Sequence, residues 1–203
     1  MPRRPSSSKP RLVLATLNRA KGHELLDLLG DVPWELTLLA DTPGATLPEE
    51  TGTTYAQNAL IKARAAMRAT GTTALADDSG IEVDALDGGP GLHSARWGGP
   101  GLDDAGRNAL LLERLRGVPR ERRTARYRCL IAIVDPDRRE RLVEGTCEGL
   151  IAPAPRGDGG FGYDPIFFFP PLNATFGEVS AEVKHGVSHR GIAARAARAL
   201  LAG

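Results

Sequence analysis

Two short stretches of the chain combine residue types that could do chemistry on a phosphorylated ligand. In the first, the apolar run 73–76 ends at two adjacent carboxylates, Asp77 and Asp78. We expect these acids at the open end of a strand, where α/β sheets bind ligands and a divalent cation is a natural partner. The second stretch, 159–165, is a glycine-rich loop with two aromatic residues and an acid. Its glycines permit close backbone approach and its aromatics offer a stacking face, so together the stretches predict a nucleotide and a metal.

The two adjacent acids have two interpretations. Neighbouring strand residues point to opposite faces, so one of Asp77 and Asp78 faces the ligand while the other braces the turn. Alternatively, both acids only end the strand in a turn. Mg²⁺ fits this pattern better than zinc, because it needs few carboxylates and shares its other positions with water and phosphate. The sequence has no histidine and cysteine cluster of the zinc type.

A turn after the first predicted strand could bind phosphate. It consists of Thr16, Leu17, Asn18, Arg19, Ala20 and Lys21. Backbone N–H groups and the positive end of a helix would attract phosphate there, and Lys21 would add a mobile charge. The alternative is an ordinary turn in which Asn18 caps the helix and Lys21 is solvated.

Further polar residues lie on and before the second predicted helix. Asn58 and Lys62 are four residues apart and share a helix face that could contact phosphate or could simply be solvated. Glu49 and Glu50 precede this helix closely enough to reach the same metal. Both interpretations of this face remain open from the sequence.

Donor side chains also gather near the C-terminus. Lys184, His189 and Arg190 follow the aromatic loop, and could read an acceptor oxygen on a base. A single histidine is usually structural or on the surface, so His189 is a candidate only because of its neighbours.

The elements that must position these residues alternate between strand and helix. Periodicity and turn residues predict strands near 12–16, 35–39, 73–77, 81–86, 126–134, 141–148 and 166–169, and helices over 21–29, 54–70, 103–116 and from the cap Ser188 to Leu201. Gly30 and Gly71 are expected to end the first two helices. The turn 135–137 predicts a hairpin, which argues against a purely parallel sheet. We therefore expect an α/β or α+β fold with a mixed sheet.

Length and composition restrict the class of protein. The 203 residues predict a single domain over 11–203 behind a polar, disordered tail at 1–10. A net charge of +1 argues against general adhesion to nucleic acid or membranes, and no stretch reads as a membrane span or secretory signal. Cys129 and Cys147 are expected to be reduced and buried. These features predict a soluble, cytoplasmic protein.

A series of blocks follows one pattern in order along the chain. The blocks are Leu14-Ala15-Thr16-x-Asn18-x-x-Lys21, Glu49-Glu50-Thr51-Gly52-Thr53-Thr54, Asn58-Ala59-x-x-Lys62-Ala63, Ala76-Asp77-Asp78-Ser79-Gly80, Pro90-Gly91-x-x-Ser94-Ala95-Arg96, Gly160-Phe161-Gly162-Tyr163-Asp164-Pro165 and Ser188-His189-Arg190-Gly191. Over about residues 11–202 the chain resembles the non-canonical purine nucleoside triphosphate pyrophosphatases. The resemblance implies a homodimeric, Mg²⁺-dependent enzyme that hydrolyses ITP, dITP and XTP to the monophosphate and pyrophosphate. It also implies a long curved mixed sheet flanked by helices, in two lobes with the substrate cleft between them.

The resemblance assigns roles around the phosphates and the metal. Residues 16–21 and Lys62 would hold the triphosphate. Glu49 and Asp78 would hold Mg²⁺, with Glu50 as the alternative ligand. Asp78 also matches the proton acceptor of the family. The candidate catalytic residues are therefore Asp78, Lys21 and Lys62.

The resemblance also assigns contacts to the nucleoside. These would come from Ser79, Phe161, Gly162, Tyr163, Asp164, Lys184, His189 and Arg190. Phe161 would stack on the base, and the last three would read the 6-oxo edge. Such donors suit a 6-oxo purine and oppose the 6-amino group of adenine. Guanine must be excluded at its 2-position, by a residue that the sequence does not identify.

Two other functions and one structural question stay open from the sequence. The chain could be a related pyrophosphatase for modified pyrimidine or standard nucleotides, or a nucleotide-binding sensor without catalysis. Leu17 stands where many relatives carry a small or polar residue. A positive φ at that position would strain a leucine. Either the backbone of Leu17 is therefore ordinary, or the phosphate loop differs slightly from that of the relatives.

Overall fold

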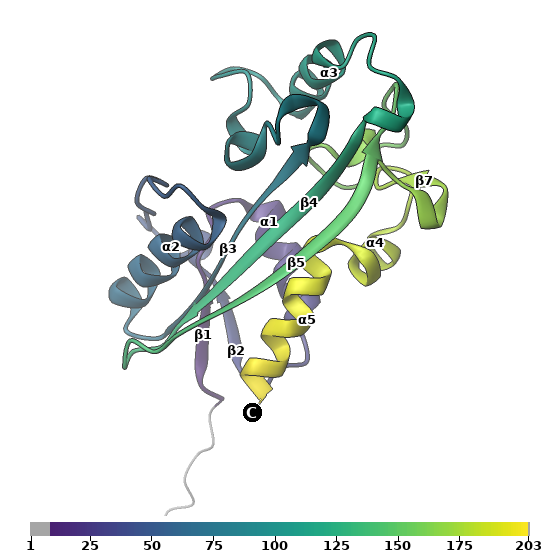
Figure 1. Cartoon of the computed structure of the whole chain (residues 1–203). Helices are drawn as coiled ribbons and strands as arrows, with labels where there is room; N and C mark the ends of the chain where they lie inside the picture. Colours follow the sequence, from purple (N-terminus) through teal and green to yellow (C-terminus); the bar gives the residue numbers. More distant parts are fainter. Residues whose placement is uncertain (1–8, 203) are drawn as a thin grey trace, which may run out of the picture.

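The chain folds around one mixed sheet with helices on both faces (Figure 1). The computed structural model describes residues 9–202, so the predicted tail at 1–10 lies, apart from its last two residues, outside the described residues. Within that range the strand order is β2-β1-β3-β4-β5-β6-β7. The strands are β1 (Arg11–Leu14), β2 (Glu35–Leu38), β3 (Thr73–Val83), β4 (Thr124–Val134), β5 (Glu140–Ile151), β6 (Phe167–Phe169) and β7 (Ala174–Thr175). β1 pairs in parallel with β2 and β3, whereas the later pairs are antiparallel, which confirms the predicted mixed sheet.

Helices cover the two faces because β1 and β3 are apolar on both sides. The helices are α1 (Arg19–Leu29), α2 (Tyr55–Thr70), α3 (Asp104–Arg114), α4 (Ala181–Val187) and α5 (His189–Ala202). Leu12 and Leu14 pack in one cluster with α1 and α5, whereas Val13 and Ala15 pack in another with α2. This alternation is the strand period of two. The sheet therefore carries α1 and α5 on one face and α2 on the other.

Gly71 and Ser188 lie at the helix ends where the sequence predicts them, and Thr54 supplies a cap that it does not predict. The Thr54 side chain caps α2 by accepting from the Gln57 N–H, and Gly71 ends that helix with φ 68°. The Ser188 hydroxyl accepts from the Gly191 N–H at the start of α5. Helix α4, capped by Ser180, was not predicted, because its seven residues are too few to show a clear period.

The prediction for the acidic stretch was wrong in one respect. The sequence predicts strands near 73–77 and 81–86 with a turn between them, but the structure has the single strand β3 through this region. β4 pairs with β3 residue by residue, including Asp77 with Ile131 and Asp78 with Leu130. This ladder satisfies the backbone groups in place and overrides the turn composition. The acids therefore lie inside a strand, and the interpretation that they only end one is also wrong.

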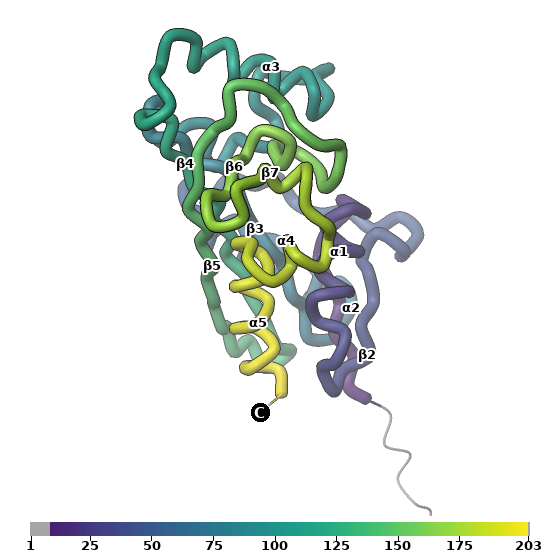
Figure 2. The backbone as a smooth tube through the Cα atoms, turned by 90° about the vertical axis from the view of Figure 1, so that its right-hand side faces the viewer, coloured from purple at the N-terminus to yellow at the C-terminus, as the bar shows by residue number. Residues whose placement is uncertain are grey.

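The long strands β3, β4 and β5 extend past β1 and β2 and carry a second packed region (Figure 1). α3, β6 and β7 lie around this far part, and in Figure 2 β6 and β7 lie above α4 while α5 continues below it. The second region has its own apolar cluster, which includes Ile81, Leu111, Tyr127 and Phe167. The molecule thus has two packed regions joined by long strands, as the resemblance implied.

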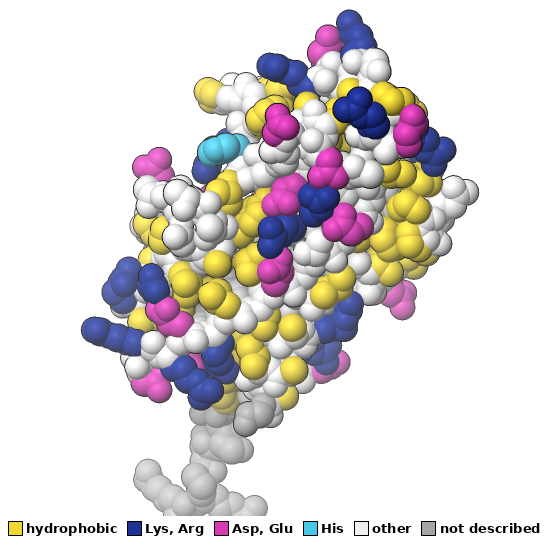
Figure 3. All heavy atoms as spheres, in the orientation of Figure 1, with side chains coloured by type: hydrophobic (Ala, Val, Ile, Leu, Met, Phe, Trp, Pro, Cys, Tyr) yellow, Lys and Arg dark blue, Asp and Glu magenta, His cyan; other side chains and the backbone are white. Residues whose placement is uncertain are grey.

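One face of the long strands is open and charged. Figure 3 shows side chains of both signs gathered over β3–β5. Arg126 lies 2.9 Å from Asp84 and 3.2 Å from Glu148, and Arg128 contacts Glu144 and, at 3.7 Å, Glu82. Such exposed pairs contribute about 0–1 kcal/mol each, so we assign this surface no role in holding the fold.

The cysteines are free and buried, as predicted. Burial raises the pKa of both thiols, that of Cys147 to about 12. Across residues 9–202, every helix is too short or too polar to cross a membrane.

Candidate active site

A cavity lies between the two packed regions. Its walls come from the start of α1, from β3 and β4, from the 3₁₀ segment Gly91–Arg96, from α3, from the loop 161–164 and from α4 and α5. The predicted site residues that line it are Asn18, Lys21, Ser79, Phe161, Gly162, Tyr163, Asp164, Lys184, His189 and Arg190. Thr16, Leu17, Arg19, Ala20, Glu49, Lys62 and Asp78 are not among its lining residues. The structure thus gathers the predicted nucleoside contacts in one place, with Lys62 and Asp78 outside the cavity wall.

The turn 16–21 is held by its own side chains. The Asn18 N–H donates to the Thr16 hydroxyl at 3.1 Å, and the Lys21 N–H donates to Asn18 Oδ1 at 3.1 Å, which caps α1. Leu17 is exposed and lies outside the left-handed region, so its backbone is ordinary and unstrained. Arg19 donates to Asp41 Oδ1 at 2.9 Å on the surface, away from the cavity.

Successive residues of β3 present their side chains to opposite faces. Asp78 points to the α2 side, where Oδ1 lies 3.3 Å from Lys62 Nζ and Oδ2 accepts from Asn58 Nδ2 at 3.1 Å. Asp77 points to the α1 side, where Lys21 Nζ lies 3.8 Å from its Oδ2. Because β1 pairs with β3 only as far as residue 75, the edge of β3 beside both acids is open toward the turn 16–21. The two lysines therefore approach one segment of strand from its two faces.

The two acids have opposite electrostatic surroundings. Burial raises the pKa of Asp78 above its ordinary value; Lys62 opposes that shift and Glu50 adds to it. Burial would also raise the pKa of Asp77, but the charges of Lys21 and Arg190 outweigh it and hold this pKa below its ordinary value. Asp78 is therefore the better proton acceptor of the pair, and Asp77 is the more firmly ionised partner of the cations.

The two glutamates before α2 differ in position. Glu50 is half-buried, and its carboxylate accepts from Lys62 at 2.6 Å and from Arg96 at 3.5 Å. Glu49 is exposed. Over the part of the chain that the structure describes, no group of three or more His, Cys, Asp or Glu side chains is placed to hold a metal. Lys62 thus links Glu50 to Asp78, whereas Glu49 lies outside this group.

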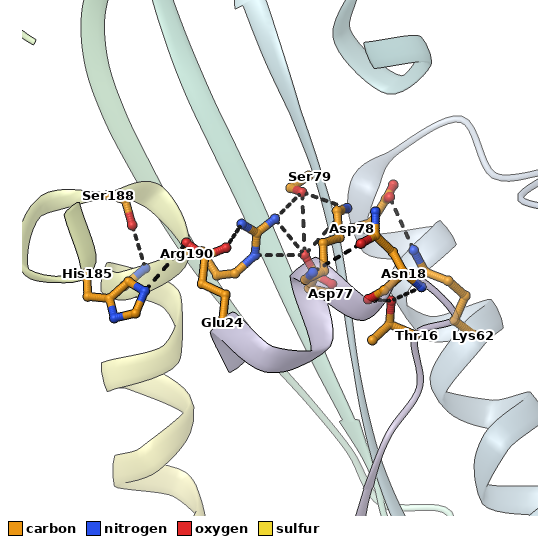
Figure 4. A network of polar contacts seen from close by, with 12 residues as sticks. Thr16, Asn18, Glu24, Lys62, Asp77, Asp78, Ser79, His185, Ser188 and Arg190 are labelled. Carbon is orange, nitrogen blue, oxygen red and sulfur yellow. Dashed lines mark hydrogen bonds and ion pairs between the residues drawn. The ribbon is translucent and has the colours of Figure 1, made fainter. Parts of the chain in front are cut away.

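A buried network of charges joins α1, β3, α4 and α5 (Figure 4). Arg190, 1% exposed, donates to Glu24 Oε2 at 2.5 Å, to Asp77 Oδ2 at 3.2 Å and to the Ser79 hydroxyl at 2.9 Å. Glu24 also lies 3.4 Å from Lys184 Nζ. Figure 4 shows Arg190 between Glu24 and the pair Asp77 and Ser79. These carboxylates and cations are almost fully buried, so each is stable as a charge only beside its partners.

The glycine-rich loop is anchored to this network through Asp164. Its carboxylate accepts from Lys184 Nζ at 2.7 Å and from the Phe161 N–H at 2.8 Å. The Lys184 ammonium lies 4.7 Å from the centre of the Phe161 ring. On its other side the loop is tied to α3, because the Gly162 N–H donates to Asp104 at 2.7 Å. The loop is therefore held to α4 on one side and to α3 on the other, and it presents the Phe161 ring to the cavity.

His189 forms part of the cavity wall as a neutral imidazole. Burial and the charges of Arg190 and Lys184 hold its pKa well below the ordinary value. Its ring stacks on Tyr127 with centres 4.4 Å apart and planes at 7°. Nδ1 is buried and has no hydrogen-bond partner among the described residues. A neutral ring can donate from one nitrogen and accept at the other, so it can read either kind of group on a base.

Sequence reasoning missed several cavity and network residues. The structure adds Glu24, Ser94, Asp104, Arg107 and Tyr127. Glu24 had a detectable signal, because it is a carboxylate on the buried side of α1, next to Leu25 and one turn before Leu28. Ser94 belongs to a block that the sequence had singled out. For Tyr127, Asp104 and Arg107 no local pattern marks them as cavity residues.

Comparisons with known proteins agree over nearly the whole chain. A model of the Ham1 family matches residues 12–200. A dITP/XTP pyrophosphatase of Desulforamulus reducens is 50% identical, covering 94% of this chain and 95% of the relative. One from Symbiobacterium thermophilum is 54% identical, covering 90% of each.

Solved structures give the same result. A HAM1 protein from Coxiella burnetii superposes with a TM-score of 0.86 at 38% identity, covering 95% of this chain and 98% of that one. A nucleoside-triphosphatase, or dITP/XTP pyrophosphatase, from Mycobacterium abscessus has a TM-score of 0.74 at 45% identity, covering 94% and 98%. Sequence and fold therefore agree that this chain belongs to the Ham1 family.

Proposed function

We propose that this chain hydrolyses non-canonical purine nucleoside triphosphates, namely ITP, dITP and XTP, to the nucleoside monophosphate and pyrophosphate. One observation carries the proposal: Lys21 and Lys62 reach the adjacent acids Asp77 and Asp78 from opposite faces of β3, at its open edge beside the start of α1. Two ammonium groups and a helix N-terminus around carboxylates suit a metal-bound polyphosphate. The names of the relatives favour purine substrates over the pyrimidine alternative.

The carboxylates near Lys62 fit Mg²⁺ better than they fit a metal whose ligands all come from the protein. Asp78 and Glu50 are carboxylates bridged by one lysine, with Nζ 3.3 Å and 2.6 Å away. Mg²⁺ takes one or two carboxylates and completes its shell with water and substrate phosphates. We therefore propose Asp78 as a ligand, with Glu50 in preference to the more exposed Glu49. When bound, Mg²⁺ would neutralise phosphate charge and orient the reacting oxygens.

The residues of the chain would then position and activate water. Lys21 and the N–H groups at the start of α1 would hold the phosphates, and Lys62 would stabilise charge on the group that leaves as pyrophosphate. Asp78 would accept the proton of the water that attacks the α-phosphorus, since burial favours its protonated form. This set of acid and lysines favours an enzyme over a sensor without catalysis.

Base selection would follow from the far end of the cavity. Lys184 and Arg190 place donor groups beside Phe161, whose ring would stack on the base, and His189 lines the same cavity. A 6-oxo purine would satisfy these donors, whereas the 6-amino group of adenine would face them with another donor.

The activity itself is tested by the products. With ITP or XTP and Mg²⁺, the purified chain should release pyrophosphate and the monophosphate, measured by anion-exchange chromatography and a pyrophosphate-coupled assay. Removing the metal with EDTA should abolish release, and added Mg²⁺ should restore it. Orthophosphate as the first product, or faster turnover of UTP or ATP, would contradict the proposal.

The glycine-rich loop gives a second prediction. Gly160 has φ 71°, and a Cβ there would meet Asp164 Oδ2 at 2.1 Å. Gly160→Ala should raise the KM for ITP, because it strains the backbone and displaces the carboxylate that holds the loop. Gly162 is the matched control, since its φ is 63° but a Cβ there meets nothing within 4 Å. Gly162→Ala should add only the backbone strain of a positive φ, about 1–2 kcal/mol. Equal KM values for the two variants would show that the Asp164 contact does not shape the site.

The oligomeric state and location also belong to the proposal. The family resemblance implies a homodimer, and we place it in the cytoplasm, where nucleotide pools are cleansed. Light scattering coupled to size-exclusion chromatography tests the first statement, and fractionation of the source cells tests the second.

A further inference from the structure

Arg107 of α3 lines the cavity from the second packed region. Its side chain is only 15% exposed, and Nε is buried without a hydrogen-bond partner in the described structure. The acid nearest to it in sequence, Asp104, is 3.8 Å away through Oδ1 and is itself 56% exposed. Asp104 already accepts from the Gly162 N–H through its other oxygen. Arg107 is thus a largely buried cation that is only loosely paired.

The other cations of the cavity wall are held closely by partners. Arg190 lies 2.5 Å from Glu24, and Lys184 lies 2.7 Å from Asp164. Lys21 donates to Ser79 at 3.1 Å. A guanidinium has five N–H donors and no acceptor, so Arg107 retains most of its donor capacity for a ligand in the cavity.

The position of Arg107 relative to the stacking ring indicates what it would contact. Lys184 and Arg190 lie on the α4 and α5 side of Phe161, at 4.7 Å and 5.6 Å from the ring centre. The α3 side begins at Gly162, whose carbonyl accepts from Asn108 Nδ2 at 3.1 Å. A purine stacked on Phe161 with its 6-oxo group toward α4 and α5 therefore turns another edge of the ring toward α3.

We propose that Arg107 is a specificity-determining residue that reads the 2-position of the purine. The inference rests on the proposed function and extends it to the substituent that separates xanthine, hypoxanthine and guanine. Xanthine carries a 2-oxo acceptor, which the guanidinium satisfies. Hypoxanthine carries only hydrogen at this position. Guanine carries a 2-amino donor, which leaves donor facing donor in a largely buried place.

The test compares Arg107→Met and Arg107→Lys with the wild type on XTP, ITP, dITP and GTP. Arg107→Met keeps the apolar length of the side chain and removes its donors. We expect the ratio of kcat/KM for XTP to that for ITP to fall by about 10- to 100-fold, the worth of a hydrogen bond from a charged group. The ratio for GTP to ITP should rise. Arg107→Lys should retain part of the XTP preference, because it keeps a positive donor.

A matched control lies on the same helix. Arg114 is exposed, and Arg114→Met should leave both ratios unchanged. Equal losses on XTP, ITP and GTP in Arg107→Met would overturn the inference, because they would show a structural role. A larger loss of kcat/KM on ITP than on dITP, with the XTP to ITP ratio unchanged, would also overturn it. That result would show that Arg107 contacts the ribose instead of the base.

The experiment separates this inference from the proposed function. Binding of XMP, IMP and GMP to the same variants by calorimetry needs no turnover. If the wild type releases no pyrophosphate but prefers XMP to GMP, and Arg107→Met loses that preference, the activity is wrong and the assignment of Arg107 stands. If the wild type turns over XTP and Arg107→Met keeps both preferences, the assignment of Arg107 is wrong and the activity stands.

Discussion

Asp78→Asn should lower kcat for ITP by about 10³-fold while the fold persists. The amide keeps the size of the carboxylate but cannot accept a proton from water or contribute negative charge to a metal. Lys62 keeps its partner Glu50 at 2.6 Å in this variant, so no buried ammonium is left unpaired. The measurements are kcat from pyrophosphate release and the melting temperature of the same preparation.

Two other Asp→Asn variants are the controls for Asp78→Asn. Asp137, an exposed acid in the turn between β4 and β5, should tolerate the same substitution with no change in kcat. Asp77→Asn should lower stability, because Asp77 is buried and its carboxylate accepts from Arg190. Turnover near the wild-type rate in Asp78→Asn would remove this residue from the mechanism.

Arg190→Met should destabilise the fold by about 3–5 kcal/mol, since it removes one partner of a buried ion network. Asp77 and Glu24 would then be left 2% and 8% exposed without the guanidinium that pairs with both. For a chain of this size the loss corresponds to a melting temperature lower by roughly 6–20 °C. Thermal and urea unfolding measure it directly.

An exposed ion pair provides the comparison for Arg190. Arg64 donates to both oxygens of Glu140 at 2.6 Å and 2.7 Å, but its side chain is 42% exposed. Arg64→Met should cost no more than about 1 kcal/mol. Adding Asp77→Asn and Glu24→Gln to Arg190→Met should recover part of the loss, because the two carboxylates that lost the guanidinium are then replaced by neutral amides. If Arg190→Met is as stable as Arg64→Met, the network does not hold the fold.

Elements with local signals were predicted well. Helix α2 has an alanine-rich stripe at helical spacing and a glycine stop, and the structure places it over Tyr55–Thr70. The hairpin of β4 and β5 turns at 135–137, as its composition predicted. In both cases the decisive interactions join residues that are close in sequence, so the pattern of residue types is sufficient.

The acidic stretch shows where local signals mislead. Asp77, Asp78, Ser79 and Gly80 have the composition of a turn, yet they continue β3. Gly80 is needed there for a tertiary reason, because a Cβ would meet the Gly91 carbonyl at 2.3 Å. Pairing with β4, about 50 residues later in the chain, decides the backbone at this point.

The sequence alone determined the family, the mixed sheet and the residue types that gather at the site, because these depend on local periodicity and on motifs with fixed spacing. The period of two along a strand already placed Asp77 and Asp78 on opposite faces. Only the tertiary structure decided that both acids lie inside one continuous strand, and that Lys21 meets Asp77 while Lys62 meets Asp78. Partners such as Glu24 and Arg190 lie 166 residues apart, and no short-range pattern records which buried charge neutralises which. That choice is made by packing, since a carboxylate inside the fold is stable only beside the cation that the sheet and helices bring to it.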